Sequence, residues 1–171
     1  MRAYDGTKSE AADAGTQADA VQPHLASSRH GFGLPNRLGR LMWQGVEGTA
    51  FRFSPVPFHS WRRFLLRAFG ARVHPTAHVY PTVRVWAPWN LTMEANSCLA
   101  WGVDCYSVDR IVLRPQALVS QHARLVTASH DIRDPDFRLI HGPIEVGRSA
   151  WVCAYAFVGM GVTLGEGSVV A

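Results

Sequence analysis

Aliphatic residues recur at every sixth position through the C-terminal part of the chain. Five of them follow one another without a break: Val146, Val152, Val158, Leu164 and Val170. The residue after each of the five is Gly, Cys or Ala, so a small side chain repeats in the same frame. The frame also recurs upstream in three groups of three, with two extra residues between groups: Val73, Val79 and Val85; Met93, Leu99 and Cys105; Leu113, Val119 and Leu125.

A period of six matches neither a helix, with about 3.6 residues per turn, nor the two-residue alternation of a strand. It is typical of a parallel β-helix, in which each hexad forms one flat side and a corner and three hexads close a coil. About fifteen hexads predict about five coils, stacked roughly 4.8 Å apart. Residues 131–139 would then leave the prism, with Ile140 and Ile144 supplying a degenerate hexad after them. A β-sandwich of alternating strands does not account for five consecutive matches.

Residues 36–70 carry a helical pattern instead. Asn36 is expected to cap a helix in which apolar residues recur at helical spacing: Leu38, Leu41, Met42 and Val46. Pro55 and Pro57 interrupt it, and a second helix in HSWRRFLLRAFG ends at Gly70. Its predicted apolar stripe contains Trp61, Phe64, Leu65 and Phe69, with Arg62, Arg63 and Arg67 beside it. Either these helices cover one end of the β-helix, or residues 59–69 lie on an anionic membrane surface.

Composition and charge divide the 171 residues into three parts. Residues 1–35 contain few large apolar groups and predict a disordered extension. Residues 36–70 hold six basic residues and one acidic residue, whereas residues 71–171 hold eight of each. Because the excess of basic over acidic residues is confined to one short segment, no nucleic-acid partner is expected.

Cysteine content and hydropathy favour a reducing, cytoplasmic location. The three cysteines, Cys98, Cys105 and Cys153, show no CxxC spacing, so neither a disulfide framework nor a zinc ribbon is predicted. The sequence also contains no apolar run long enough for a membrane span and no secretory leader pattern.

Four stretches of the sequence resemble the hexapeptide-repeat acyltransferases, most closely the O-acetyltransferases of the colanic-acid-biosynthesis type. They read WRRFLLRAFGARV (61–73), APWNLTMEANSCLAWGV (87–103), TASHDIRDPDF (127–137) and PIEVGRSAWVCAYAFVGMGVTLGEGSVVA (143–171). The resemblance implies a left-handed parallel β-helix. It also implies transfer of an acetyl group from acetyl-CoA to a sugar hydroxyl in exopolysaccharide or lipopolysaccharide biosynthesis. The acceptor would be a free, nucleotide-linked or lipid-linked saccharide, and the enzyme a homotrimer with sites between neighbouring subunits.

One departure from the family concerns the C-terminal end. Members of the family continue past the GEGSVVA segment with another turn and a tail whose basic residues help to hold coenzyme A. This chain ends at Ala171, one residue after a hexad begins. The β-helix domain is therefore expected to be truncated, with part of the donor site absent.

The resemblance assigns the catalytic role to His130, in the SHD segment where the chain leaves the prism. A histidine at an outward-facing coil corner can accept the proton of an acceptor hydroxyl, because its neutral form is populated near pH 7. Asp131, Asp134 and Asp136 resemble the substrate-side loop of the family and would orient His130 or hold sugar hydroxyls. As solvated loop carboxylates they would have neither task, and Asp134 before Pro135 would only start a turn.

The donor is expected along the coils after this excursion, where small side chains let the pantetheine arm approach the backbone. The candidates are Trp151, Cys153, Ala154 and Gly159, with the amide near Ala154 bonding the thioester oxygen. A packing role for Trp151 is equally consistent with the sequence. Cys105 and Cys153 take inward and small positions, which favours packing over a nucleophilic role.

Two other functions remain open. Some left-handed β-helix trimers hold zinc through three histidines and act on carbon dioxide, as carbonic anhydrases do. Here His122, His130 and His141 lack the short paired spacing of that family, so no metal is expected. A non-catalytic scaffold or truncated remnant would instead be marked by the absence of coenzyme A binding.

Overall fold

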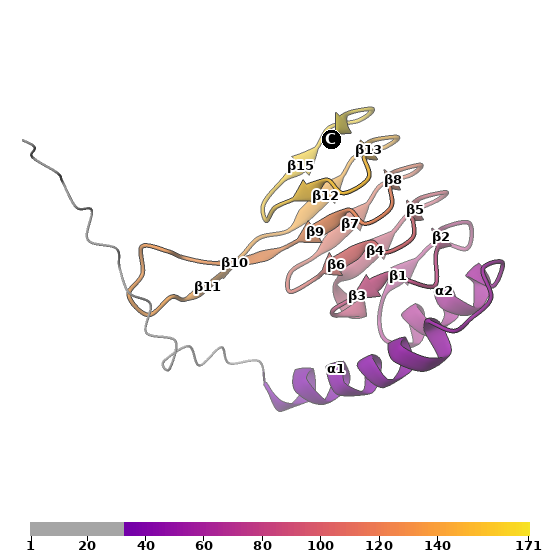
Figure 1. Ribbon diagram of the computed structural model, residues 1–171, viewed down its shortest axis with the longest axis horizontal. Helices are drawn as coiled ribbons and strands as arrows, with labels where there is room; N and C mark the ends of the chain where they lie inside the picture. The colour runs from indigo at the N-terminus through magenta and orange to yellow at the C-terminus, as the bar shows by residue number, and fades with distance from the viewer. Residues whose placement is uncertain (1–32) are drawn as a thin grey trace, which may run out of the picture.

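The computed structural model describes residues 33–171, in which short parallel strands coil above two helices (Figure 1). The prediction of a disordered extension over residues 1–35 falls almost entirely outside the described residues. Among residues 33–171, no helix combines the length and the apolar character that crossing a bilayer requires.

Fourteen short strands form three parallel sheets, which the chain visits in turn. The first sheet contains β1 (Arg72–Val73), β4 (Leu91–Met93), β7 (Ile111–Leu113), β12 (Ile144–Val146) and β15 (Thr163–Leu164). The second contains β2 (His78–Val79), β5 (Cys98–Leu99), β8 (Leu118–Val119), β13 (Trp151–Val152) and β16 (Val169–Val170). The third contains β3 (Arg84–Val85), β6 (Asp104–Tyr106), β9 (Arg124–Val126) and β14 (Phe157–Val158). The predicted β-helix of about five coils is confirmed.

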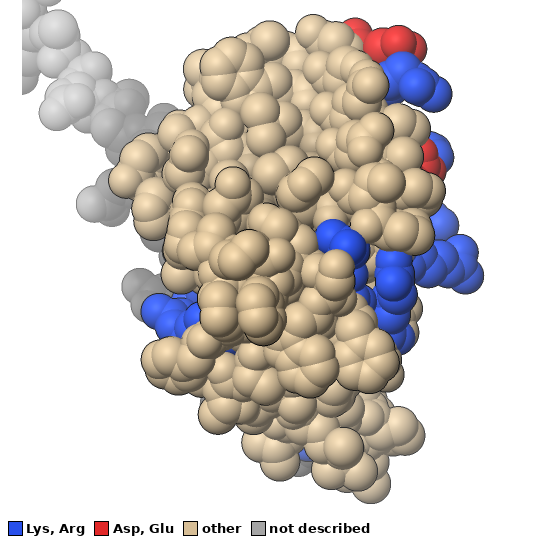
Figure 2. Space-filling view, turned by 90° about the vertical axis from the view of Figure 1, so that its right-hand side faces the viewer, with Lys and Arg blue, Asp and Glu red and all other residues tan. Residues whose placement is uncertain are grey.

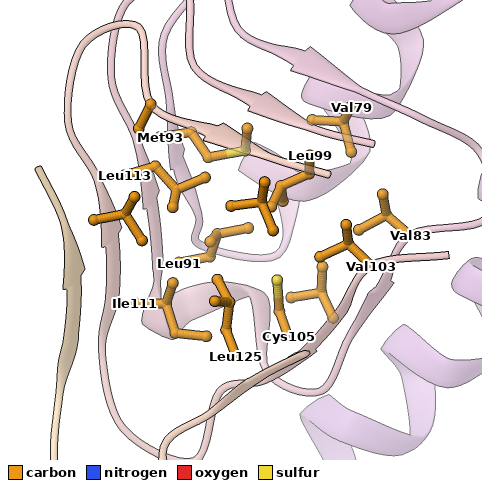
Figure 3. Packing of buried hydrophobic residues seen from close by; sticks show 14 of the residues in the cluster. Val79, Val83, Leu91, Met93, Leu99, Val103, Cys105, Ile111, Leu113 and Leu125 are labelled. Atoms are coloured by element: carbon orange, nitrogen blue, oxygen red, sulfur yellow. The ribbon is translucent and has the colours of Figure 1, made fainter. Parts of the chain in front are cut away.

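The six-residue frame fills the interior of the prism. Val79 pairs with Leu99 and Leu99 with Val119, so equivalent frame positions stack directly above one another. Leu99, Leu113 and Leu125 are fully buried, and Figure 3 shows side chains of successive coils meeting inside the prism. The register follows from burial, because a slip of one residue would expose the whole aliphatic row.

The excursion after the third coil is an antiparallel hairpin of β10 (Ala128–His130) and β11 (Leu139–His141), which projects away from the prism (Figure 1). The expected degenerate hexad is therefore wrong. Ile140 lies in the hairpin and is 38% exposed, whereas Ile144 is fully buried and pairs with Ile111 in an ordinary coil. The reason is that Ile140 can satisfy its backbone by pairing with Ser129 outside the prism.

The N-terminal helix does not start or pack as predicted. The α1 helix (Leu34–Val46) begins after Gly33, and the Asn36 side chain accepts a bond from Arg40 instead of capping. It runs into a π-helical segment, η2 (Glu47–Phe51), and a short 3₁₀ helix, η3 (Pro88–Asn90), follows in the first coil. Trp43 and Phe51 supply the buried face, whereas three residues expected in the stripe are exposed: Leu38, Leu41 and Met42.

The second helix, α2 (His59–Ala68), also buries a different face from the predicted one. Leu65 and Leu66 are buried, while Trp61 and Phe64 of the predicted stripe are exposed. Gly70, at φ +90°, ends the helix as predicted. Its N–H bonds to Arg67 O and the next N–H, of Ala71, bonds to Leu66 O, which is a Schellman motif.

The helices supply donors to the open end of the β-helix. Each coil donates its strand N–H groups to the following coil, as in the bond from His78 N to Ser97 O, so the first coil presents carbonyls outward. Four side chains donate to these carbonyls: Arg67 to Val73 O (2.7 Å), Arg63 to Ala77 O (2.8 Å), Arg62 to Val79 O (2.6 Å) and Trp43 to Val85 O (2.6 Å). The arginines of α2 thus bind the β-helix and are not available as a lipid-facing row.

Candidate active site

His130 lies in β10, at the base of the hairpin. Its Nδ1 lies 2.6 Å from the backbone carbonyl of Phe137, and its ring stacks on the Phe137 ring with a centroid separation of 4.6 Å. A carbonyl only accepts hydrogen bonds, so Nδ1 carries the proton and Nε2 of the neutral ring carries the lone pair. The contact with Phe137 thus holds the half-buried ring in a tautomer that can accept a proton.

The predicted position of His130 needs a correction. It was expected at a corner of the prism, but the chain has already left the prism at Ala128 and His130 pairs with Leu139 in the hairpin. The pairing partner is a segment nine residues away, which a periodicity of six does not anticipate.

The three candidate aspartates shape the loop at the tip of the hairpin. Asp131 Oδ1 accepts from the Arg133 amide, and Asp134 Oδ1 accepts from the Asp136 amide, both at 2.9 Å. Asp134 also pairs with Arg138 at 2.8 Å, and the more exposed Asp136 lies 3.9 Å from the same guanidinium. These contacts are those of loop-closing groups, and the group seen to hold Nδ1 of His130 is a carbonyl.

A second histidine with an oriented ring lies on the same hairpin. His141 Nδ1 is 2.8 Å from Asp109 Oδ2. His130 pairs with Leu139, which is two residues from His141 on the same strand, so the side chains of His130 and His141 project to the same face of the hairpin. Partial burial would raise the pKa of Asp109, but hydrogen bonds from His141 and from the Arg110 amide lower it overall. Sequence reasoning missed this pair, because 32 residues separate its members.

Three of the four donor candidates, Trp151, Cys153 and Ala154, lie around a turn at a different corner, between the second and third sheets. Residues 153–156 form a turn that is closed by a hydrogen bond from Ala156 N–H to Cys153 O (3.3 Å), and Tyr155 has a φ of +63°. This places Ala154 at the second position of a type II turn, whose N–H points away from the turn. Within residues 33–171, no acceptor lies within hydrogen-bonding reach of the Ala154 N–H. Pro81 takes the equivalent position in the first coil, as the strand register shows.

The side chains next to this turn have partners of their own. Cys153 N–H donates to Val170 O (2.7 Å), and the Trp151 indole N–H donates to Ser120 Oγ (2.7 Å). The Trp151 ring remains 44% exposed and lies over Leu118 of the neighbouring strand. Burial raises the pKa of the Cys105 thiol, which agrees with the predicted packing role.

Within one chain, the predicted site residues lie at two different corners of the prism. His130 and the three aspartates lie at the corner between the third and first sheets. Gly159 follows β14 at this corner, where Gly142 of the hairpin and Gly161 lie so close that a Cβ on Gly142 would be 3.1 Å from Gly161 N. Trp151, Cys153 and Ala154 lie at the corner before β14, so the third sheet separates them from His130.

Comparison with known proteins gives the family. No protein-family model matches the chain. Over 140 residues it is 34% identical to WcaF of Escherichia coli (strain K12) and to WcaF of Shigella flexneri, covering 82% of this chain and 77% of each relative. The name of both relatives assigns them to colanic acid biosynthesis as acetyltransferases. The chain belongs to the hexapeptide-repeat acetyltransferases.

Solved structures share the fold of this acetyltransferase. A galactoside acetyltransferase in complex with coenzyme A aligns with a TM-score of 0.71 at 19% identity, covering 81% of this chain and 70% of that one. An acetyltransferase from Vibrio cholerae O1 biovar eltor, complexed with acetyl coenzyme A, aligns with a TM-score of 0.70 at 19% identity over 81% and 76%. A maltose O-acetyltransferase from Clostridium difficile 630 gives 0.59 at 18% identity over 81% and 79%.

Within one chain, the three histidines of the zinc alternative lie at two different corners. His122 lies at the corner of Ala154 and stacks on Tyr155, with centroids 5.1 Å apart, whereas His130 and His141 lie on the hairpin. No group of three or more His, Cys, Asp or Glu side chains in residues 33–171 is arranged to hold a metal ion.

Proposed function

We propose that this acetyltransferase moves the acetyl group of acetyl-CoA to a sugar hydroxyl in exopolysaccharide or lipopolysaccharide biosynthesis, with His130 as general base. The observation that carries the proposal is the bond between His130 Nδ1 and the Phe137 carbonyl, which leaves Nε2 as the proton acceptor. The acceptor class rests on the name of the WcaF relatives.

The reaction needs no acyl-enzyme. His130 Nε2 takes the hydroxyl proton as the sugar oxygen forms a bond to the thioester carbonyl carbon. The Ala154 N–H donates to the carbonyl oxygen, where negative charge develops. When the carbon–sulfur bond breaks, coenzyme A leaves as a thiolate and recovers the proton from His130. Trp151, Cys153 and Gly159 would flank the pantetheine arm.

A homotrimer is part of this proposal. In one chain the third sheet separates His130 from Ala154, so a site that uses both has to take them from adjacent subunits. Flat prism sides around a three-fold axis bring one corner of each subunit next to a different corner of its neighbour.

The test is His130→Ala with a sugar acceptor, compared with His74→Ala, an exposed histidine of the first coil. Loss of a general base lowers kcat by about 10²–10⁴-fold, whereas coenzyme A binding and thermal melting should stay unchanged. His130→Ala with more than about a tenth of wild-type kcat refutes the assignment. An inactive His141→Ala beside an active His130→Ala would transfer the role to the Asp109–His141 pair. Failure of the wild type to bind coenzyme A would favour the scaffold alternative.

A further inference from the structure

The helices at the base of the β-helix leave an extensive apolar surface uncovered. Nine of the eighteen large hydrophobic side chains that are exposed within residues 33–171 belong to residues 33–70. They are Leu34, Leu38, Leu41, Met42, Phe53, Val56, Phe58, Trp61 and Phe64. We call this set the cap patch. Contiguous exposed apolar surface of this kind marks an interaction site.

The patch follows one side of a continuous helix. Leu34, Leu38 and Leu41 recur along one stripe of α1, opposite the buried Trp43, and the exposed Phe53 lies in the turn after η2. At its far end the stripe enters a hollow of about 900 Å³ lined by Phe53, Pro57, Phe58, Trp61 and Phe64 together with smaller side chains. A helix that is apolar on both sides is normally buried on both sides. One side of this helix therefore lacks its partner.

The charges around the patch are of one sign. Glu47 is the single carboxylate of residues 33–70, and its Oε1 accepts from the Val85 amide at 2.7 Å, toward the β-helix. Arg37 is exposed beside the stripe, and Arg52 is exposed just after η2, next to Glu47 and to Arg84 of the first coil. In Figure 2 uncharged residues fill the lower part of the face, Lys and Arg lie around its middle, and Asp and Glu appear only in the upper half.

We propose that the cap patch binds the surface of an anionic lipid bilayer. Apolar side chains enter the boundary between headgroups and acyl chains, while Arg37 and Arg52 meet anionic headgroups. A second copy fits less well, since pairing two patches would bring their arginines together, and Glu47, the one carboxylate of residues 33–70, bonds to the β-helix. Residues 1–32 fit less well too, because their large apolar residues are few: Met1, Tyr4, Val21, Leu25 and Phe32.

The binding face differs from the one predicted from sequence. The sequence suggested residues 59–69 with their arginines, but Arg62, Arg63 and Arg67 bond to strand carbonyls. The lipid-facing cations are instead Arg37 and Arg52, and the α1 stripe extends the surface beyond α2.

Flotation of the full chain with phospholipid vesicles tests the proposal. The chain should float with vesicles of phosphatidylcholine and phosphatidylglycerol at 3:1, and bind several-fold less to pure phosphatidylcholine or in 0.5 M NaCl, where charges are screened. Arg52→Gln should weaken binding about fivefold. Leu41→Ser combined with Phe53→Ser should weaken it at least tenfold, since both side chains are more than half exposed and their loss leaves the fold intact.

The matched control is Ile132→Ser, which removes an exposed aliphatic side chain from the hairpin loop and should leave flotation unchanged. Equal flotation with both vesicle types, or equal losses in the patch and control variants, would overturn the proposal. Sedimentation of the same variants separates the other occupants. A patch variant that lowers the oligomeric mass but floats like the wild type would assign the surface to a second copy. A chain of residues 33–171 that floats where the full chain does not would assign it to the N-terminal segment.

Discussion

Arg62 offers the sharpest test of how the helices join the β-helix. The side chain is fully buried, and its guanidinium donates to Val79 O (2.6 Å), Ser54 Oγ (2.8 Å), Pro55 O (2.8 Å) and Val56 O. Among residues 33–171, no carboxylate lies within 4.0 Å of it, so the dipoles of three carbonyls and the Ser54 hydroxyl stabilise its charge. Burial accordingly lowers the pKa of Arg62 from its ordinary value.

The cost of Arg62→Ala follows from the acceptors it leaves behind. His59 Nδ1 also lies 2.9 Å from Val79 O, so that carbonyl keeps a donor. Two or three other acceptors lose theirs, at about 1–3 kcal/mol each where water cannot enter. Removing a buried charge returns part of this amount. We therefore expect Arg62→Ala to lower the free energy of unfolding by about 2–4 kcal/mol, and Arg62→Lys by nearly as much, because an ammonium cannot reach acceptors in several directions.

Urea unfolding of the full chain, followed by circular dichroism at one protein concentration, measures this loss. Arg63→Ala is the matched control, since it removes a partly buried bond to Ala77 O and an exposed bond to Ser60 Oγ, and it should cost about 0.5–1.5 kcal/mol. A loss for Arg62→Ala below about 1 kcal/mol, or equal to that of Arg63→Ala, would show that the buried network does not hold the helices in place.

Three further changes test the base and the upper coils. Burial raises the pKa of Glu47 above its ordinary 4.5 despite the Val85 amide, so the contribution of Glu47 to stability falls as pH rises past 4.5. Melting temperatures should therefore show Glu47→Gln gaining on the wild type as pH rises, with no gain below pH 4.5. Gly147→Ala should lower the melting temperature strongly, because its Cβ would lie 2.5 Å from Leu164 O. Gly45→Ala, in open space on α1, should raise stability by about 0.5–1 kcal/mol in urea unfolding.

The β-helix could be predicted because the residues that recur at every sixth position are the residues that pack inside the prism. Every frame residue from Val73 to Val158 is buried, and each coil places a buried side chain at the same position as the coil below it. The buried face of the helices could not be predicted in the same way. Apolar residues lie on both sides of α1, so spacing alone did not tell whether Trp43 or Leu38 faces the core. Tertiary contact with the first coil decided it, through the bond from Trp43 to Val85 O.

The site residues remain predictions that rest on the resemblance to the family. His130 was proposed from the resemblance of its surroundings, but the group that holds its ring is a backbone carbonyl, which leaves no mark in a sequence. The Ala154 amide was proposed from the same resemblance. The separation of the donor and base residues onto two corners follows from the count of hexads between them. It predicts that two variants that are inactive alone recover activity in mixed trimers, which a site within one chain does not allow.

Mixing two inactive variants tests whether the site is shared between subunits. His130→Ala lacks the base, and Ala154→Pro lacks the amide donor, whose loss should lower kcat by about 10²–10³-fold. The turn should tolerate proline, since Pro81 takes the same position in the first coil.

After the two variants are unfolded together and refolded at 1:1, a site that takes His130 from one subunit and Ala154 from its neighbour is intact in about a quarter of cases. Activity should therefore return to about a quarter of the wild-type value. Wild type refolded 1:1 with the double variant should likewise fall to about half of its activity before mixing, and co-purification of an untagged variant with an affinity-tagged one reports exchange independently of activity. If co-purification shows exchange while the two single variants stay inactive together, both groups act within one chain, and the shared site is wrong.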